Sequence, residues 1–259
     1  MAVYFLSDFH FGADWRKDES SRVRLFIDFL DRIKSDAENI YILGDLFDFW
    51  FEYRNGFPNK YPEITDKLAE YSESGIKVVL VGGNHDWWAG ETFISLTGAE
   101  VFKNDAEVHH YGKRIYLGHG DGKAITDWQY RILRKILRNP FTIFLFKQLP
   151  YAIGIQLARL VSSGSHYANE HRQWKFLDEY KDAAKPVLGQ GFDAILLGHT
   201  HIPQWVQLPE GLYINTGDWI QHFTFVKLDD EGFSMKTFKN GNIENFDPSL
   251  LTPPTNSTK

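Results

Sequence analysis

Five short polar clusters in the chain combine residue types that bind divalent metal ions. The clusters are Asp8-Phe9-His10, Gly44-Asp45-Leu46-Phe47-Asp48, Gly83-Asn84-His85-Asp86, Gly118-His119-Gly120-Asp121 and Gly198-His199-Thr200-His201. Carboxylate oxygens, amide oxygens and imidazole nitrogens suit hard or borderline cations such as Mn, Fe, Co or Zn. Any one cluster is equally consistent with an ordinary turn or a surface pair. The five together predict a site for divalent metal ions.

Each cluster stands at the C-terminal end of a short apolar run that is typical of a β-strand. The runs are Val3–Leu6, Ile40–Leu43, Val78–Val81, Ile115–Leu117 and Ala194–Leu197. The segments between the first three have helical periodicity, as in Arg22–Lys34. Strands that alternate with helices predict an α/β fold with a partly parallel sheet. Because ligands bind outside the carboxyl ends of such strands, we expect the clusters to converge.

The chain after residue 203 has a different pattern, in which short strands are separated by turns. The expected strands are Gln204–Leu208, Leu212–Asn215, Phe223–Leu228 and Phe233–Phe238. This spacing predicts a second sheet, with antiparallel strands.

The spacing of the clusters predicts an insertion. Asp8, Asp45, Asn84 and His119 follow one another at intervals of 35–39 residues, whereas 80 residues separate His119 from His199. The extra length reads as helical. We therefore expect a core formed by residues 1–121 and 191–245, a helical cap at 122–190 and a flexible tail at 246–259.

The expected cap is basic, and its first helix is amphipathic. Residues 122–190 contain 11 Lys and Arg and 5 Asp and Glu, a net charge of +6, which leaves −12 for the rest of a chain whose net charge is −6. Trp128, Ile132 and Ile136 share one face of the helix, and Arg131 and Lys135 lie on the other. One interpretation is an ordinary helical subdomain with a solvated charged face. The other is a lid that holds an apolar substrate chain and contacts an anionic membrane surface.

The composition excludes several classes of protein. There is no cysteine, so any metal must be held by nitrogen and oxygen ligands. The net charge of −6 argues against a nucleic-acid partner. The N-terminal residues do not resemble a signal peptide, and polar residues interrupt the most apolar region, Phe141–Val161, so no spanning helix is expected. We expect a cytoplasmic protein, with peripheral contact to the inner membrane face as a further possibility.

The ordered set of clusters resembles that of the calcineurin-like metallophosphoesterases. The resemblance implies a sandwich of two mixed β-sheets flanked by helices, an α/β fold that carries the inserted cap and a two-metal centre. By the same resemblance, one ion is held by Asp8, His10 and His201, the other by Asn84, His119 and His199, and Asp45 bridges both. Two divalent ions are implied, with Mn²⁺ preferred over Fe, Co or Zn.

Further roles follow for residues beside these ligands. His85 is expected to face the phosphate, with Asn84 also taking part in catalysis. Asp86 is expected to orient the imidazole of His85, as outer carboxylates do at metal sites. The same logic makes Asp48 and Asp121 outer partners of the ligands.

Local motifs are similar to those of the branch of this family that cleaves UDP-2,3-diacylglucosamine in lipid A biosynthesis. They are Ser7–His10, Tyr41–Asp48, Thr126–Tyr130 after His119-Gly120-Asp121, and Gly198–Pro203. The resemblance implies that UMP and 2,3-diacylglucosamine 1-phosphate are the products. It also implies that Asp127 and Tyr130 contact the glucosamine diphosphate, that Ser165 and Arg172 contact the head group, and that the cap holds the acyl chains.

One departure leaves other functions open. That branch commonly has Gly-Asn-Arg-Asp where this chain has Gly83-Asn84-His85-Asp86, and histidine at this position is typical of general phosphodiesterases. A phosphodiesterase or pyrophosphatase that acts on a soluble nucleotide is therefore the alternative, and a non-catalytic scaffold is a remote one. No protein partner is predicted. Trp87 and Trp88 could stack on a uracil, although packing is the more common role after a strand.

Overall fold

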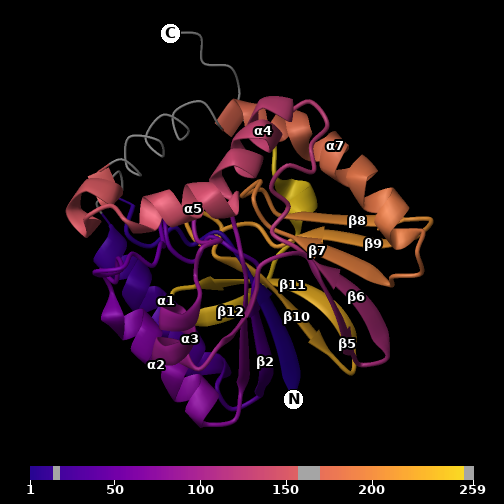
Figure 1. Cartoon of the computed structure of the whole chain (residues 1–259). Coiled ribbons are helices and arrows are strands. Elements are labelled where there is room, and N and C mark those ends of the chain that lie inside the picture. The colour runs from indigo at the N-terminus through magenta and orange to yellow at the C-terminus, as the bar shows by residue number, and fades with distance from the viewer. Residues whose placement is uncertain (14–17, 157–169, 254–259) are drawn as a thin grey trace, which may run out of the picture.

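Two mixed β-sheets pack face to face in a computed structural model that describes residues 1–13, 18–156 and 170–253 (Figure 1). Along β1 (Ala2–Leu6) the side chains alternate between the two faces of the sheet, as the pleat requires. Val3 and Phe5 belong to the core between the sheets, whereas Tyr4 and Leu6 pack under the helices on the outer face. The predicted fold class, two mixed sheets flanked by helices, is confirmed.

The first sheet has seven strands in the order β12-β11-β10-β1-β2-β3-β4. Strands β1, β2 (Ala37–Ile42), β3 (Lys77–Val81) and β4 (Glu100–Phe102) are parallel to one another. Strands β10 (Thr224–Asp229), β11 (Gly232–Lys239) and β12 (Asn242–Asn245) extend the sheet beyond β1 with antiparallel pairing.

The second sheet has five strands in the order β5-β6-β7-β9-β8. Its central strands β6 (Lys113–Leu117), β7 (Ala194–Leu197) and β9 (Gly211–Asn215) are parallel. Its edge strands β5 (Ala106–His110) and β8 (Gln204–Leu208) are antiparallel to their neighbours. The prediction that the strands after residue 203 form an antiparallel sheet of their own is therefore wrong. The chain between β9 and β10 crosses from the second sheet to the first.

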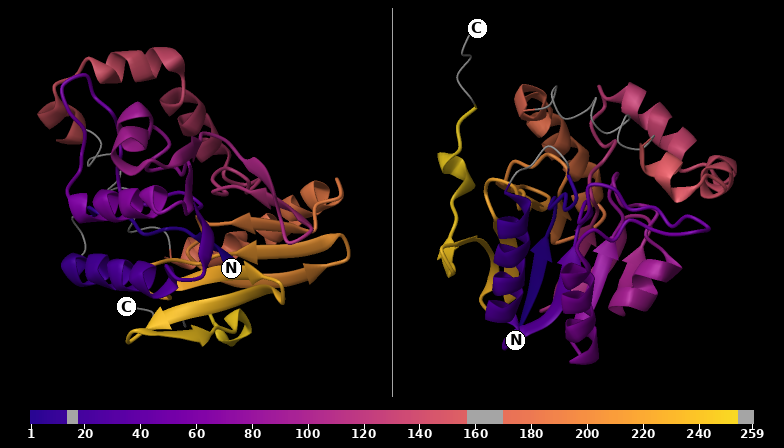
Figure 2. Two further views of the ribbon diagram at one scale, coloured as in Figure 1. Left: turned by 90° about the horizontal axis from the view of Figure 1, so that it is seen from below. Right: turned by 90° about the vertical axis from the view of Figure 1, so that its left-hand side faces the viewer.

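Helices cover the outer faces of both sheets. Helices α1 (Glu19–Ile33), α2 (Pro62–Glu73) and α3 (Glu91–Thr97) pack on the first sheet. Helix α7 (Glu170–Leu188) packs on the second through Tyr180, Ala184 and Leu188. The layers are therefore helices, first sheet, second sheet and helix (Figure 2).

Between β6 and β7 the chain forms α4 (Trp128–Leu137), α5 (Pro140–Lys147) and α7. Helices α4 and α5 lie across the end of the sandwich at which β1 and β2 finish (Figure 1). This arrangement suits a cap, and the division into core and cap remains a prediction. Among the described helices, none is both long and apolar enough to cross a membrane.

The predicted tail begins with ordered structure. Phe246 packs against the core between the sheets, and η1 (Pro248–Leu250) is a short 3-10 helix. Residues 254–259 lie outside the described part of the chain.

Candidate metal centre

The five polar clusters meet at one end of the sandwich, because the strands that precede them all finish there. Asp8 and His10 follow β1, Asp45 follows β2 and Asn84 follows β3, all in the first sheet. His119 follows β6, and His199 and His201 follow β7, in the second sheet. Both sheets therefore contribute side chains to the same place.

The first group of possible metal ligands is formed by Asp8, His10 and His201. The Nε2 atoms of His10 and His201 are 3.2 Å apart. Oδ1 of Asp8 lies 3.3 Å from Nε2 of His201 and 3.9 Å from Nε2 of His10. Asp8 and His10 are fully buried, and His201 is partly exposed.

The second group surrounds the amide oxygen of Asn84. This Oδ1 atom is 2.9 Å from Nε2 of His119 and 2.9 Å from Nδ1 of His199. The two ring nitrogens are themselves 3.2 Å apart. An amide oxygen and two imidazole nitrogens thus form a compact triangle.

Asp45 lies between the two groups. Its Oδ2 atom is 3.5 Å from Nε2 of His10 in the first group and 3.3 Å from Nε2 of His119 in the second. A carboxylate in this position faces both groups at once, as a bridging ligand must.

The donor atoms fit divalent cations. Ligand atoms about 2.0–2.2 Å from one ion are about 3.0–3.5 Å apart at tetrahedral or octahedral angles. The separations of 2.9–3.3 Å within the groups are close to this range, and only the 3.9 Å between Asp8 and His10 is longer. Nδ1 of His119 donates to the carbonyl of Leu43 at 2.8 Å, so Nε2 is the atom turned toward Asn84. Burial acts to lower the pKa of His119, but Asp45 outweighs it and raises this pKa to about 10. The negative charge that raises this pKa also favours a bound cation.

The backbone at these residues is strained. Asp8, His10, Asp45, His199 and His201 have left-handed φ angles of 59°, 50°, 56°, 72° and 58°. Side-chain-bearing residues adopt this conformation at a cost of about 1–3 kcal/mol each, and such strain gathers at functional sites. Five of the seven predicted ligands share it.

Two glycines allow the clusters to approach one another. A Cβ atom at Gly83 would collide with the carboxylate of Asp45, and one at Gly198 would lie 2.6 Å from Oδ2 of Asp8. Any other residue at either position would push a predicted ligand out of place.

His85 is oriented by Asp48, and not by Asp86 as the sequence suggested. Nδ1 of His85 donates to the backbone carbonyl of Asp48 at 2.6 Å, and Oδ1 of Asp48 lies 3.4 Å from Nδ1 of His10. The predicted outer role of Asp48 is therefore supported by its contacts. The ring of His85 packs edge-on against that of His10, with centroids 4.6 Å apart.

The predicted role of Asp86 is wrong. Its fully buried carboxylate accepts backbone N–H groups from Asp45 at 3.2 Å, Leu46 at 2.7 Å and Gly83 at 2.9 Å. Burial and the neighbouring Asp45 raise the pKa of Asp86 to about 6. Asp86 therefore joins the loops after β2 and β3, and its effect on the site is to hold Asp45 in position.

Asp121 joins the core to α4, whereas the sequence analysis expected it to contact a metal ligand. Its Oδ2 atom accepts from Tyr130 Oη at 3.1 Å and from Arg138 at 2.9 Å, and lies 3.3 Å from Arg134. Arg138 also donates to the carbonyl of Gly83 at 3.2 Å. These cap arginines were missed because a basic helix face usually indicates contact with solvent or a membrane.

Two of the four predicted substrate contacts, Asp127 and Tyr130, have side chains in the described part of the chain. The ring centroid of Tyr130 lies 6.1 Å from that of His199, so this tyrosine borders the predicted ligands. Asp127 is partly exposed at the start of α4. Ser165 and the side chain of Arg172 lie outside the described residues.

Trp87 and Trp88 pack within the protein. Arg138 lies over the ring of Trp87 at 5.0 Å and Lys103 at 5.4 Å. The indole N–H of Trp88 donates to the carbonyl of Leu137 at 3.4 Å. Both tryptophans therefore link the loop after β3 to its surroundings, and this packing role was the more common expectation.

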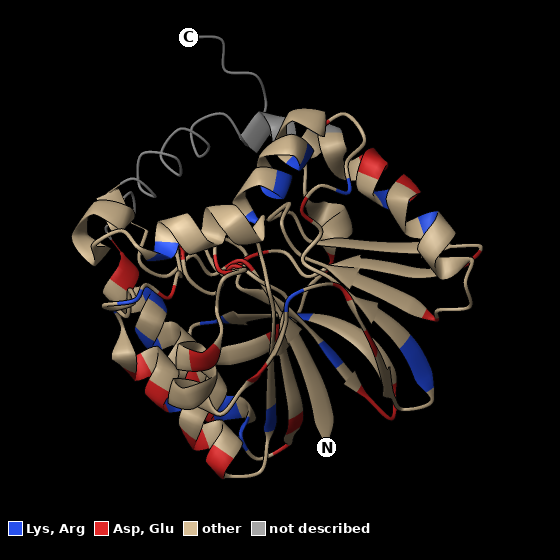
Figure 3. Ribbon diagram, in the orientation of Figure 1, with Lys and Arg blue, Asp and Glu red and all other residues tan. Residues whose placement is uncertain are grey.

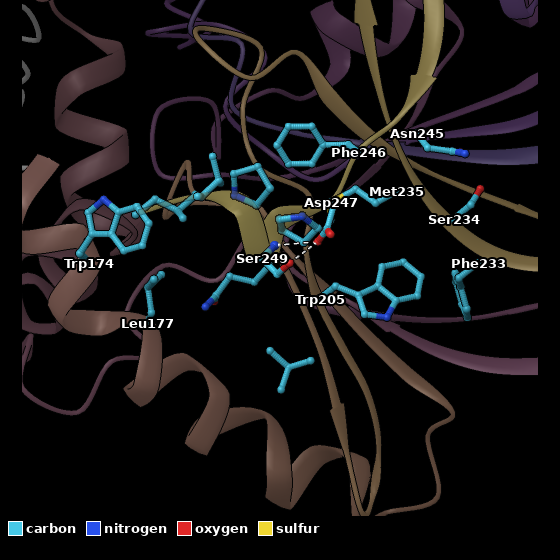
Figure 4. Close-up of a pocket in the computed structure, with 16 residues that line it drawn as sticks. Trp174, Leu177, Trp205, Phe233, Ser234, Met235, Asn245, Phe246, Asp247 and Ser249 are labelled. Atoms are coloured by element: carbon cyan, nitrogen blue, oxygen red, sulfur yellow. Dashed lines mark hydrogen bonds between the residues drawn. The ribbon is translucent and has the colours of Figure 1, made fainter. Parts of the chain in front are cut away.

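A groove of about 540 Å³ is lined by Ile202 and Pro203, the two residues that follow His201 in the chain. Figure 4 shows Trp174 and Leu177 of α7 on one side and Trp205 of β8 on another. None of the predicted metal ligands lines it.

Comparison with known proteins gives a consistent picture. The sequence profile of the calcineurin-like phosphoesterases matches residues 1–203. A protein named UDP-2,3-diacylglucosamine hydrolase from Pseudomonas fluorescens is 30% identical over 241 residues, which cover 91% of this chain and 95% of the relative. Proteins of the same name from Pseudomonas aeruginosa and Vibrio vulnificus are 30% and 26% identical, over 92% and 91% of this chain and 99% and 97% of their own.

Proposed function

Because the chain belongs to the calcineurin-like phosphoesterase family, we propose that it hydrolyses UDP-2,3-diacylglucosamine, as the names of its relatives indicate for them. Water adds to one phosphorus, the P–O bond to the bridging oxygen breaks, and UMP and 2,3-diacylglucosamine 1-phosphate leave. The observation that carries the proposal is the convergence of Asp8, His10, Asp45, Asn84, His119, His199 and His201 at one end of the sandwich.

Two divalent cations would be held by these seven residues, and Mn²⁺ is the ion we propose. Asp8, His10 and His201 would hold one ion, and Asn84, His119 and His199 the other, with Asp45 shared. Such a pair of ions polarises phosphoryl oxygens and supplies a nucleophile near neutral pH.

His85 would stabilise charge on the phosphoryl group. Its Nδ1 atom donates to the backbone carbonyl of Asp48, so Nε2 can donate to a substrate oxygen when the ring is protonated, and the imidazolium charge would then face the phosphoryl group. The leaving group is a phosphate monoester whose second pKa is about 6, so a general acid is hardly required. Asn84 would act as a ligand that also lies beside the reacting group.

The cap would bind the glycolipid and contact the membrane. Asp127 and Tyr130 would contact the glucosamine diphosphate, and Ser165 and Arg172 the head group. The apolar face of α4 and α5 is exposed at Trp128, Ile132, Ile136, Phe141 and Phe144. Basic residues lie along α4 (Figure 3), and Arg131 and Lys135 among them are exposed. Exposed apolar and basic groups together suit peripheral binding to an anionic inner membrane face, on its cytoplasmic side.

Product analysis tests the proposed reaction. Protein loaded with Mn²⁺ is incubated with detergent-dispersed UDP-2,3-diacylglucosamine, and the products are identified by mass spectrometry. UMP and 2,3-diacylglucosamine 1-phosphate are expected in equal amounts. Absence of UMP with metal-loaded protein would overturn the proposal.

A phosphodiesterase or pyrophosphatase acting on a soluble nucleotide is the second candidate, and His85 favours it. Bis-p-nitrophenyl phosphate, assayed in parallel, separates the two: rapid cleavage of the diester without release of UMP from the lipid substrate supports the second. A non-catalytic scaffold is a third, and it requires that the purified protein neither carries metal nor gains it from Mn²⁺.

A further inference from the structure

Arg22 of α1 is buried beneath the first group of predicted metal ligands. Its side chain is only 3% exposed, and a buried guanidinium is costly unless its donors are satisfied. Arg22 donates through Nε to the carbonyl of Trp219 at 3.2 Å and through a terminal nitrogen to the carbonyl of Phe9. It therefore joins the loop after β1 to the loop that precedes β10.

Phe9 is the residue between two strained ligands. Asp8 and His10 on either side of it have φ angles of 59° and 50°. Left-handed residues persist only when surrounding contacts determine their conformation. The N–H groups of Phe9 and His10 both donate to the carbonyl of Asp45 at 2.9 Å, and the carbonyl of Phe9 is held by Arg22. The peptide unit that links the two ligands is thus fixed on both sides.

Trp219 completes this support. Its backbone N–H donates to the carbonyl of Asp8 at 3.1 Å, and its indole stacks on Phe9 with centroids 5.2 Å apart. Arg22 also donates to the carbonyl of Trp219. It therefore holds both Phe9, which follows Asp8 in the chain, and Trp219, which hydrogen-bonds to the Asp8 carbonyl. Glu19, one turn earlier on α1, accepts the N–H of Gly12 and provides a negative charge beside Arg22.

We propose that Arg22 is a positioning residue for the first metal ion. By fixing the carbonyls of Phe9 and Trp219, it holds Asp8 and His10 in the left-handed conformation that brings them to His201. The inference rests on the proposed two-metal function. The second ion, at Asn84, His119 and His199, depends on Arg22 only indirectly: these ligands follow other strands, and the His199 N–H that donates to Oδ2 of Asp8 at 2.8 Å links them to the first site.

Metal binding in the absence of substrate tests this proposal. Wild-type protein, Arg22→Met and Arg22→Lys are titrated with Mn²⁺, and bound metal is counted after buffer exchange. We expect two ions per chain in the wild type. In Arg22→Met, one site should keep its affinity and the other should weaken by about 10–100-fold, the usual effect of removing a group that orients ligands. Its electron paramagnetic resonance spectrum should lose the coupling of a neighbouring Mn²⁺ pair.

Two comparisons separate positioning from general stability. Arg24 lies on the exposed face of the same helix, so Arg24→Met should bind two ions like the wild type. Arg22→Lys keeps the charge but offers no planar pair of donors, so it should fold and still weaken one site. If Arg22→Met does not fold, the Mn²⁺ titration of Arg22→Lys alone tests the proposal.

The affected site is identified with single-site backgrounds. In His119→Ala, which leaves only the first site, adding Arg22→Lys should lower the affinity for the remaining ion. In His201→Ala, which leaves the second site, adding Arg22→Lys should have a much smaller effect on the affinity for the remaining ion. Two ions bound with wild-type affinity by Arg22→Lys would overturn the proposal. No substrate is used in these titrations, so their outcome does not depend on whether the protein releases UMP from the lipid substrate.

Discussion

Oδ2 of Asp45 lies 3.3 Å from Nε2 of His119, although 74 residues separate the two along the chain. Asp45 follows β2 in the first sheet, and His119 follows β6 in the second. The contact therefore exists only because the two sheets pack so that these strand ends meet. It places one carboxylate between both histidine groups, and this position is the basis of the two-metal proposal.

Asp45 and Asp48 are expected to differ in their effect on metal binding. Asp45→Asn removes the charge that faces both groups, so we expect loss of both Mn²⁺ ions and at least a 1,000-fold loss of UMP release, the scale expected of several kcal/mol of lost charge stabilisation. Asp48→Asn should retain two ions, with one bound about 10–100-fold more weakly. Metal counting together with a UMP assay checks both. Equal behaviour of the two variants would contradict the assigned positions.

His85 is expected to tolerate arginine better than alanine. If it stabilises phosphoryl charge, His85→Arg should keep UMP release within about tenfold of the wild type, whereas His85→Ala should lose about 100-fold. Steady-state kinetics with the lipid substrate and with bis-p-nitrophenyl phosphate provide the measurement. If His85 is a general acid, both variants should lose activity to a similar extent, since neither alanine nor arginine can release a proton at neutral pH.

Glu52 is expected to stabilise the fold in a pH-dependent way. Its carboxylate accepts the N–H groups of Gly90 at 2.7 Å, Phe93 at 3.0 Å and Thr92 at 3.2 Å, at the start of α3. Burial acts to raise the pKa of Glu52, but these donors outweigh it and lower the pKa below its usual value. The stabilisation is therefore present above about pH 4.5 and is lost as pH falls through the lowered pKa.

Urea unfolding measures this contribution. Glu52→Gln should lower the free energy of unfolding by about 1–2 kcal/mol at pH 7, and the difference from wild type should shrink below pH 4.5. Glu63→Gln, at an exposed position in the first turn of α2, is the matched control. A difference that grows on acidification would show that Glu52 has the opposite role.

The exposed aromatic face of α5 is expected to bind membranes. Phe141 is 67% exposed and Phe144 is 59% exposed, so replacing both by Asp should leave the fold intact. Sedimentation with vesicles of anionic phospholipid should show strong binding for the wild type and weak binding for the double variant. Binding should also weaken with added salt. If the variant sediments like the wild type, the cap does not reach the membrane through this face.

The ends of the predicted strands could be read from the sequence because each apolar run stops at a polar cluster. The clusters that contain Asp8 and His199 were therefore expected to converge. Their left-handed backbone could not be read, since it depends on hydrogen bonds from distant loops. Asp86 was misjudged for the same reason: its partners Asp45 and Leu46 lie about 40 residues away.

The assignment of strands to sheets was also beyond the sequence pattern. Short apolar runs look the same in β9 and β10, although the two strands belong to different sheets. The difference is produced by the turn between them, where Asp218 accepts backbone N–H groups from Ile220, Gln221 and His222. Arg22 likewise looked like part of an ordinary amphipathic helix.

Anomalous scattering from a crystal grown with Mn²⁺ tests the central claim most directly. We predict two peaks, about 3.5–4 Å apart, on either side of the carboxylate of Asp45. One should lie among Asp8, His10 and His201, and the other among Asn84, His119 and His199. A single peak, or peaks that do not contact Asp45, would contradict the two-metal account.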